Sequence, residues 1–366
     1  MRIEGVDIEA VFGCVPENSV DNVAGLTALV GAEKAESIVK ATGFTTRRVA
    51  PDGTDVIDLA LPAAKRALEG TDPADIGGIV AVSFSNRDRF PALSARLQHE
   101  LGLPTSIAAY DISMACSGWV YGLCSAAQMV RLTGKKVLLV DGDVQSAWTD
   151  RSDANTLAVM GDGASATLLV PGDGVWDFAF YTDGGGADAL RCRETISMDG
   201  FGVFRFVAGP VRKFLATFIQ KSSIPVGTDP SIPVGTDPSI PVGTDPSIPE
   251  GTDPSIPEGT DPVFVPHQAN MYMVRQLADA LKLRDHTIGS GAKYANTGSC
   301  SAALSMADGM DGFSNASGRT PVLIAGFGAG LSAAAAATAV GNYKRGMLYH
   351  SALCGAVNES PENAGR

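Results

Sequence analysis

Four short apolar segments, regularly spaced, constrain the fold of this 366-residue chain more than any other feature. The first two are Gly78-Ile-Val-Ala-Val-Ser83 and Lys136-Val-Leu-Leu-Val-Asp141, and the other two start near Val263 and Val322 at almost the same separation. Near-continuous apolar runs are typical of strands that helices cover on both faces. Each interval contains a helix, a loop with a chemically functional residue, and a second helix. We therefore predict an α/β protein built from two duplicated halves packed face to face.

The duplication predicts the domain boundaries. We place the N-terminal half at residues 1–172, the C-terminal half at 173–342, and a polar tail at 343–366, to which we assign no role. Within the second half, 223–262 repeats Ser-Ile-Pro-Val-Gly-Thr-Asp-Pro three times and Ser-Ile-Pro-Glu-Gly-Thr-Asp-Pro twice. Its prolines and glycine exclude a helix or a central strand, so we predict a surface loop. It is either a partner-binding arm or a loop whose length the fold tolerates.

Composition excludes several classes of function. The formal net charge of −12 argues against nonspecific nucleic-acid binding, because phosphate affinity comes mostly from Lys and Arg. The six cysteines are scattered without metal-ligand spacing, so we expect no disulfide scaffold, no metal and no cofactor, and a reducing cytoplasm as the compartment. No apolar run is long enough for a membrane span, and no signal segment precedes the first predicted strand.

Cys116 is the first candidate reactive residue. It follows Tyr110-Asp-Ile-Ser-Met-Ala, which looks like a buried apolar strand, and it opens a predicted helix that runs to about Leu132. The positive end of a helix favours a thiolate over a thiol, so this position is expected to lower the pKa of Cys116 and make it a nucleophile. The alternative is that Cys116 is a small apolar residue that fills a strand-to-helix corner.

Two distant segments favour the reactive interpretation. His267 ends the short apolar strand that begins at Val263, and a helix is predicted from Met271. Asn296 lies in a small-residue loop that opens another predicted helix. A Cys, a His and an Asn, each just past a strand or at a helix start, provide a nucleophile, a proton handler and an amide donor. This combination predicts an acyl-thioester site.

At these segments the sequence resembles the β-ketoacyl-acyl-carrier-protein synthase III branch of the thiolase-like condensing enzymes. The resemblance covers about residues 1 to 341 and implies a five-layer αβαβα fold built from two duplicated halves. The motifs that carry it are Ala115-Cys-Ser-Gly118, Val265-Pro-His-Gln-Ala-Asn270 and Tyr294-Ala-Asn-Thr297, supported by Gly43-Phe-Thr-Thr-Arg-Arg48, Gly161-Asp-Gly-Ala164 and Gly326-Phe-Gly-Ala-Gly330.

The resemblance also implies a reaction. Cys116 would take an acyl group from an acyl thioester, carried by coenzyme A or by acyl carrier protein. Backbone N–H groups of Cys116 and Ala329 would form the oxyanion hole. His267 and Asn296 would hold the thioester of malonyl-acyl carrier protein while carbon dioxide leaves, and the resulting enolate would attack the acyl-cysteine. The expected assembly is a homodimer, in which Phe90 resembles an aromatic residue that reaches the partner's acyl pocket, and Phe327 is a further pocket candidate.

Several positions depart from the family's pattern. The tryptophan and arginine that usually grip the nucleotide end of coenzyme A fall at Ser37 and Ala41, which can neither stack on adenine nor pair with phosphate. A usual carrier-protein contact is Tyr272 here. A basic docking patch is predicted instead at Arg212, Lys213 and Arg275, although such residues can also form an ordinary solvated face.

Two other functions stay open at this point. An acyltransferase that does not decarboxylate its acceptor would use Cys116 and His267 but would not need Asn296. A noncatalytic dimer partner would typically have lost its cysteine, which this chain retains. Chalcone-type synthases share Cys, His and Asn but resemble this sequence less around Pro266 and Gly326. The acyl chain length is not predicted.

Overall fold

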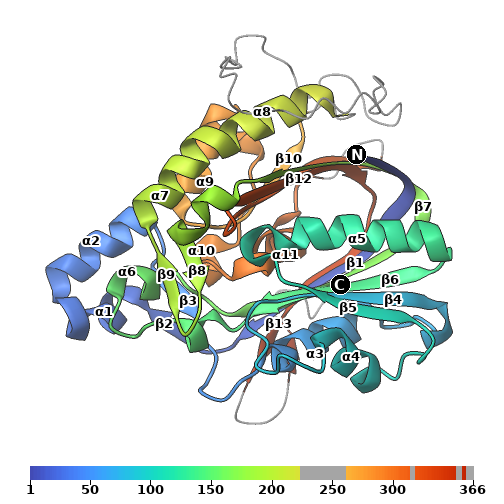
Figure 1. The fold of residues 1–366 in the computed structure, drawn as a ribbon, viewed down its shortest axis with the longest axis horizontal. Coiled ribbons are helices and arrows are strands. Elements are labelled where there is room, and N and C mark those ends of the chain that lie inside the picture. Colours follow the sequence, from blue (N-terminus) through green and yellow to red (C-terminus); the bar gives the residue numbers. More distant parts are fainter. Residues whose placement is uncertain (223–260, 314–317, 352–356, 360–366) are drawn as a thin grey trace.

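The structure is a computed structural model that describes residues 1–222, 261–313, 318–351 and 357–359. Five layers are visible in Figure 1, with helices α5 and α11 between two sheet regions and further helices on both outer faces. The helices are α1 (Asn22–Val30), α2 (Ala32–Thr42), α3 (Val56–Ala67), α4 (Leu93–Glu100), α5 (Gly118–Thr133), α6 (Ala154–Leu157), α7 (Gly200–Phe206), α8 (Arg212–Lys221), α9 (Met271–Ala280), α10 (Gly291–Tyr294) and α11 (Ser301–Gly309).

The strands of the two halves follow one plan, as the sequence predicts. The first half has the order β5-β4-β6-β7-β1, and the second has β10-β11-β12-β7. In each half a parallel pair, β4 with β6 or β10 with β11, is followed by an antiparallel pair, β6 with β7 or β11 with β12. The strands are β1 (Arg2–Pro16), β2 (Ser19–Asp21), β3 (Thr46–Arg48), β4 (Ile76–Val82), β5 (Ala108–Ile112), β6 (Lys136–Asp143), β7 (Gly163–Thr182), β8 (Leu190–Cys192), β9 (Ile196–Met198), β10 (Val263–Pro266), β11 (Thr320–Gly328), β12 (Ser332–Val340), β13 (Lys344–His350) and β14 (Val357–Glu359).

Strand β7 joins the two sheets. Its first part pairs with β6, and its last residues, from Asp177 to Thr182, pair with β12. The predicted boundary between residues 172 and 173 falls inside this strand, so the division into halves at that point stays a prediction.

Three buried apolar clusters hold the layers together. The central one packs α5 and α11 between the sheets and includes Trp119 and Leu304. A second packs α3 and α4 under the first sheet, and a third packs α8 and α9 over the other sheet. Helices shared between two sheets bury apolar side chains of both, which is the arrangement that the duplicated pattern predicts. The predicted five-layer α/β fold with two similar halves is therefore confirmed.

Helices α1 and α2 are separate because Gly31 between them has φ 82°, a backbone conformation outside the helical region. One local prediction was wrong. The strand before Cys116 is not buried. Strand β5 pairs only with β4 among the described residues, and Tyr110 is 37% exposed, because β5 lies at an edge of its sheet.

The C-terminal segment contributes to the sheet. Strand β13 pairs in parallel with β1, from Ala10 opposite Lys344 to Pro16 opposite His350. Met347 and Leu348 are buried. Part of the segment predicted as a polar tail therefore belongs to the folded core.

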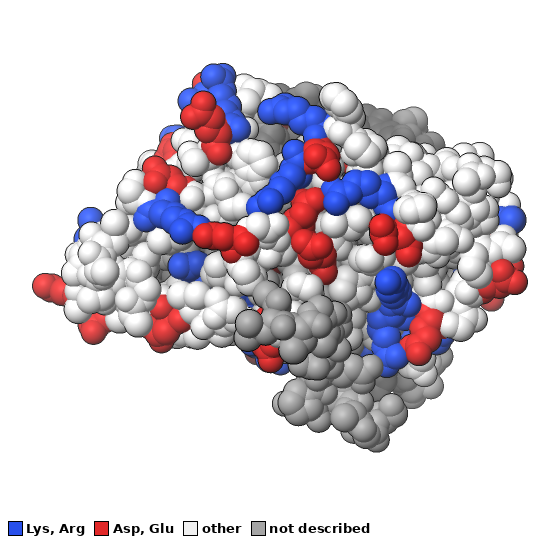
Figure 2. Space-filling view, turned by 90° about the horizontal axis from the view of Figure 1, so that it is seen from below, with Lys and Arg blue, Asp and Glu red and all other residues white. Residues whose placement is uncertain are grey.

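The octapeptide tract lies outside the described residues except for Asp261 and Pro262. Within the described part of the chain, no helix has the length and apolar character needed to cross a membrane. Figure 2 shows acidic and basic side chains interspersed over one face of the molecule. That face therefore presents no extended basic patch of the kind that binds nucleic acid.

Candidate active site

Cys116 lies in a tight connection between β5 and α5. It is the middle residue of a 3₁₀ turn, Ala115–Ser117, after which α5 begins at Gly118. Ala115 has φ 43°, a conformation uncommon for residues other than glycine. Gly328 lies so close that a Cβ there would be 2.8 Å from the Cβ of Cys116. The segment before β12 is thus brought directly over the cysteine.

The expected low pKa of Cys116 was wrong. Although Cys116 precedes a helix, the pKa of its thiol is raised to about 12, chiefly by burial and then by the carboxylate of Asp143. Hydrogen bonds from the backbone of Ala329 and of Cys116 itself lower this pKa but do not offset the burial. Asp143 ends β6, and burial raises its own pKa to about 6, so it is charged at neutral pH. Cys116 is therefore a thiol in the resting protein.

The backbone around the Cys116 sulfur provides hydrogen-bond donors. The Ala329 and Cys116 backbones both hydrogen-bond the sulfur. Ala329 does not have a positive φ, which satisfies the backbone requirement for an alanine at this place. These are the two donors that the resemblance assigns to the oxyanion hole, and they meet at the predicted nucleophile.

His267 lies directly after β10 and is 1% exposed. Its backbone N–H donates to Ala325 O at 2.7 Å, and its Nδ1 lies 2.8 Å from the hydroxyl of Ser301. Burial lowers the pKa of His267 to about 4, which a hydrogen bond with the Gly298 backbone offsets only in part. The ring is neutral at pH 7 and has one N–H donor and one acceptor nitrogen.

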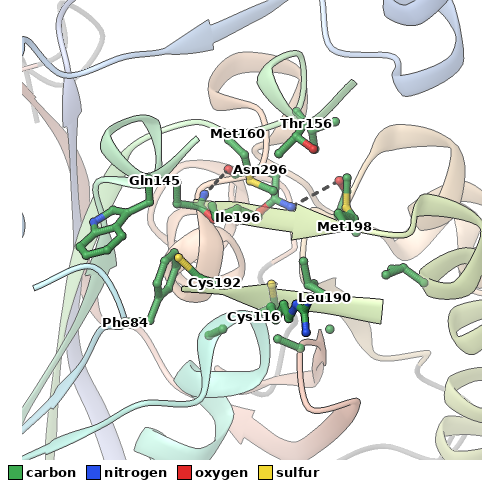
Figure 3. A pocket seen from close by; sticks show the side chains of 18 of the residues that line it. Phe84, Cys116, Gln145, Thr156, Met160, Leu190, Cys192, Ile196, Met198 and Asn296 are labelled. Atoms are coloured by element: carbon green, nitrogen blue, oxygen red, sulfur yellow. Dashed lines mark hydrogen bonds between the residues drawn. The ribbon is translucent and has the colours of Figure 1, made fainter. Parts of the chain in front are cut away.

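Asn296 is held by its own backbone and by one side of its amide. The backbone donates to Val159 O at 3.1 Å and accepts from Gly161 N at 2.8 Å and from Gln145 Nε2 at 2.7 Å, the last of which is drawn in Figure 3. Its Oδ1 accepts from Gly298 N at 3.0 Å. The amide oxygen is therefore already hydrogen-bonded, whereas among the described residues the NH₂ group donates one long hydrogen bond, of 3.5 Å, to Ala269 O and has a second N–H to donate.

The three predicted catalytic residues line one cavity of about 1140 Å³. Figure 3 shows Cys116 and Asn296 within it, beside side chains from β8 and β9. Phe327 also lines the cavity, and its ring meets the His267 ring edge-on at a centroid distance of 5.4 Å. Other lining residues include Ser83, Phe84, Gln145, Trp148, Thr156, Met160, Leu190, Cys192, Ile196, Met198, Val203 and Met273.

The remaining predicted site residues lie outside this centre. Phe90 is 86% exposed and does not line its own chain's cavity, whereas its neighbour Arg89 does. Arg212, Lys213 and Arg275 lie on α8 and α9, also outside the cavity lining, and their docking role stays a prediction. Among the described residues, no cluster of three His, Cys, Asp or Glu side chains could hold a metal ion.

The structure adds residues that the sequence did not single out. Ser301 supports His267, Asp143 faces Cys116, and Cys192 lines the cavity from β8. On α7, Arg205 lies over the exposed Phe201 ring, and the half-buried Phe204 ring lies 6.0 Å from the ring of Tyr272 on α9, the position already noted in the sequence. No local motif marks these residues, because the fold alone brings them together.

Comparison with known proteins gives one consistent family. Residues 110–184 match the model of 3-oxoacyl-[acyl-carrier-protein] synthase III, and residues 262–340 match its C-terminal model. A β-ketoacyl-[acyl-carrier-protein] synthase III of Geobacillus kaustophilus is 30% identical, covering 90% of this chain and 96% of the relative. The enzyme of the same name from Gloeobacter violaceus is 31% identical, covering 89% and 96%.

A solved structure agrees with these sequence relatives. The 3-oxoacyl-(acyl-carrier protein) synthase of Burkholderia xenovorans LB400 superposes with a TM-score of 0.79 at 27% identity, over 94% of this chain and 97% of that one. The fold and the sequence comparison therefore point to the same family. The chain belongs to the β-ketoacyl-[acyl-carrier-protein] synthase III family of thiolase-fold condensing enzymes.

Proposed function

We propose that this protein is a ketosynthase that joins a Cys116-bound acyl group to malonyl-acyl carrier protein by decarboxylative condensation, in fatty-acid or secondary-metabolite synthesis. The observation that carries the proposal is the meeting of a cysteine, a neutral histidine and an amide donor in one cavity. Relatives named β-ketoacyl-[acyl-carrier-protein] synthase III support it.

The first half-reaction forms the acyl-enzyme. Because the pKa of Cys116 is about 12, its proton must leave as the sulfur attacks the acyl thioester. This proton ends on the sulfur of the departing donor, which leaves as a free thiol, so the step balances. The Cys116 and Ala329 N–H groups stabilise the negative oxygen of the tetrahedral intermediate. The products are acyl-Cys116 and a free thiol.

The second half-reaction forms the new carbon–carbon bond. An N–H of His267 and the NH₂ of Asn296 donate to the thioester carbonyl of the malonyl group. Carbon dioxide leaves, and the electrons of the broken C–C bond form an enolate whose oxygen these donors stabilise. The enolate carbon attacks the acyl carbonyl, and Cys116 departs as a thiolate that takes up one proton. A β-ketoacyl-carrier protein is the product.

A two-step mass measurement tests this function. Wild-type protein is incubated with an acyl thioester and analysed intact, and malonyl-carrier protein is then added while carbon dioxide and the carrier-protein mass are followed. Asn296→Ala should still acylate Cys116 but should lose condensation by about a hundredfold or more. Gln276→Ala, on the exposed side of α9, is the control. Transfer of the acyl group without carbon dioxide release would instead support the acyltransferase alternative.

The homodimer forms part of the proposal. Strand β5 has a free edge among the described strands, and an unpaired edge can accept another strand. Phe90, 86% exposed beside the cavity-lining Arg89, would contact a second copy in this assembly. Analytical ultracentrifugation should find a dimer, and Phe90→Ala should weaken it. A wild-type monomer at micromolar concentration would contradict this assembly.

A further inference from the structure

Strand β13 lies beyond the residues that the family models match. The C-terminal match ends at residue 340, whereas β13 spans Lys344–His350 and pairs with β1 along its whole length. Its contacts with the rest of the chain lead toward the active site along two routes, one to Asn296 and one to His267.

The first route passes through two phenols. Tyr294 is fully buried at the end of α10, two residues before Asn296. Its hydroxyl donates to Asp308 Oδ2 at 3.2 Å and lies 3.2 Å from the hydroxyl of Tyr349 on β13. Since the Tyr294 proton goes to Asp308, Tyr349 is the donor in the phenol pair. The Arg48 guanidinium, 5.1 Å from the centre of the Tyr349 ring, stabilises that ring in place.

The residue between Tyr294 and Asn296 shows why this anchor matters. Ala295 has φ 62° and ψ −152°, a conformation that a non-glycine residue adopts only when its surroundings impose it. On one side, the Asn296 backbone is fixed by Val159 and Gly161. On the other side, Tyr294 is fixed by its hydroxyl. The position of the Asn296 backbone therefore depends on both anchors, and β13 supplies part of the second.

The second route passes through α11. Met347 of β13 and Leu304 of α11 meet over Gly13, where an added Cβ would lie 2.5 Å from the Met347 sulfur and 2.4 Å from Leu304 Cδ2. The first residue of α11 is Ser301, whose hydroxyl lies 2.8 Å from His267 Nδ1. Cys116 is carried by a different segment, the connection from β5 to α5.

We propose that β13 is a built-in support for the decarboxylating side of the site, and that Tyr349 is a positioning residue that acts through Tyr294 on Asn296. The inference rests on the proposed function, because it assigns Asn296 to the decarboxylation step. It predicts that damage to β13 slows condensation while the formation of acyl-Cys116 is left intact.

The test compares two phenol-to-phenyl variants on the same C-terminal extension. Tyr349→Phe removes only the hydroxyl that reaches Tyr294. Tyr343→Phe is the matched control, because its hydroxyl donates to Met306 O at 3.1 Å and not to Tyr294. For each variant we would measure the rate of Cys116 acylation by intact mass, the rate of carbon dioxide release from malonyl-carrier protein, and the melting temperature.

We expect Tyr349→Phe to release carbon dioxide about five- to tenfold more slowly than the wild type, with acylation within about twofold. Tyr343→Phe should keep both rates at a similar melting temperature. In a Tyr294→Phe background, adding Tyr349→Phe should slow carbon dioxide release little further, because the hydrogen bond between the two phenols is already lost.

Three outcomes would overturn the inference. If Tyr349→Phe decarboxylates as fast as Tyr343→Phe, β13 does not position Asn296. If the rates of acylation and of decarboxylation fall equally in Tyr349→Phe, the substitution causes a general loss of structure. If the wild type itself acylates Cys116 but releases no carbon dioxide, the proposed function fails and this inference fails with it. The wild-type measurement therefore separates the failure of the proposed function from that of the inference alone.

Discussion

The Nδ1 of His267 lies 2.8 Å from the hydroxyl oxygen of Ser301, which also accepts a hydrogen bond from the Gln268 N–H at 3.1 Å. Ser301 opens α11, in the loop-helix segment that also carries Asn296, so the residue that orients the histidine and the amide donor are five positions apart in the chain. His267 and Asn296 are thus placed by one segment, even though His267 itself comes from β10.

Ser301→Ala should weaken the second half-reaction. The His267 ring loses the partner that fixes its orientation, and we expect condensation to slow by about tenfold, as for the loss of one buried hydrogen bond. The buried Gln268 N–H also loses its acceptor, which should lower the free energy of unfolding by about 1 to 3 kcal/mol. Steady-state kinetics and denaturant titration measure the two effects. Ser305→Ala, on the same helix and also buried, is the control, and an equal loss of activity there would contradict a specific role for Ser301.

Asp143→Asn should make Cys116 more reactive. The carboxylate is charged above its pKa of about 6 and raises the pKa of Cys116, so its removal should increase the thiolate fraction at pH 8 by about three- to tenfold. Alkylation of Cys116, located by peptide mass spectrometry, measures this change. The difference between the two proteins should shrink as pH falls through 6, because wild-type Asp143 then becomes protonated. If the ratio of the alkylation rates of the variant and the wild type does not change with pH, Asp143 acts on Cys116 through packing and not through its charge.

The sequence supported the fold and the three central residues better than it supported their chemistry. Apolar strands and helix starts are local patterns, so they located Cys116, His267 and Asn296 near the ends of the right elements. The shift in the pKa of Cys116 was predicted in the wrong direction, because it depends on burial and on Asp143 at the end of β6. Neither is visible in the local motif.

The edges of the sheet were also hard to predict. The segment Ala108–Ile112 has the composition of a strand, but exposure of β5 follows from its place at the end of the strand order. Likewise, β13 (Lys344–His350) is short and begins with two charged residues, and the burial of its middle follows from pairing with β1, far away in the sequence. Long-range pairing is the information that a single sequence pattern lacks.

Shortening the octapeptide tract should have little effect on the enzyme. Helix α8 ends at Lys221 and β10 begins at Val263, and both are held by buried contacts of the third cluster. Reducing the five repeats to one changes the loop-closure free energy by only about 1 to 2 kcal/mol. We expect the melting temperature and turnover to stay close to those of the wild type. Loss of activity at an unchanged melting temperature would instead assign the tract a partner-binding role.

The acyl donor should be recognised with little help from a nucleotide. Ser37 and Ala41 line the cavity on the α2 side, where they offer neither an aromatic ring nor a positive charge. Arg47 is buried and donates to Asn22, and Arg151 pairs with Asp52 away from the cavity lining, so neither is placed to replace the missing contacts. Recognition then falls to the acyl chain, the pantetheine arm and the carrier protein.

We therefore expect an acyl-pantetheine or an acyl-carrier protein to acylate Cys116 with an efficiency within about tenfold of the matching acyl-coenzyme A, a difference of roughly 1.4 kcal/mol. A stacked adenine and a charged phosphate contact would together exceed that difference. The measurement is the acylation rate against concentration for three donors with one acyl group. Ser37→Trp/Ala41→Arg provides the matched gain-of-contact variant and should raise the efficiency for acyl-coenzyme A alone. A hundredfold preference of the wild type for acyl-coenzyme A would show that other residues, such as the cavity-lining Arg193, bind the nucleotide end.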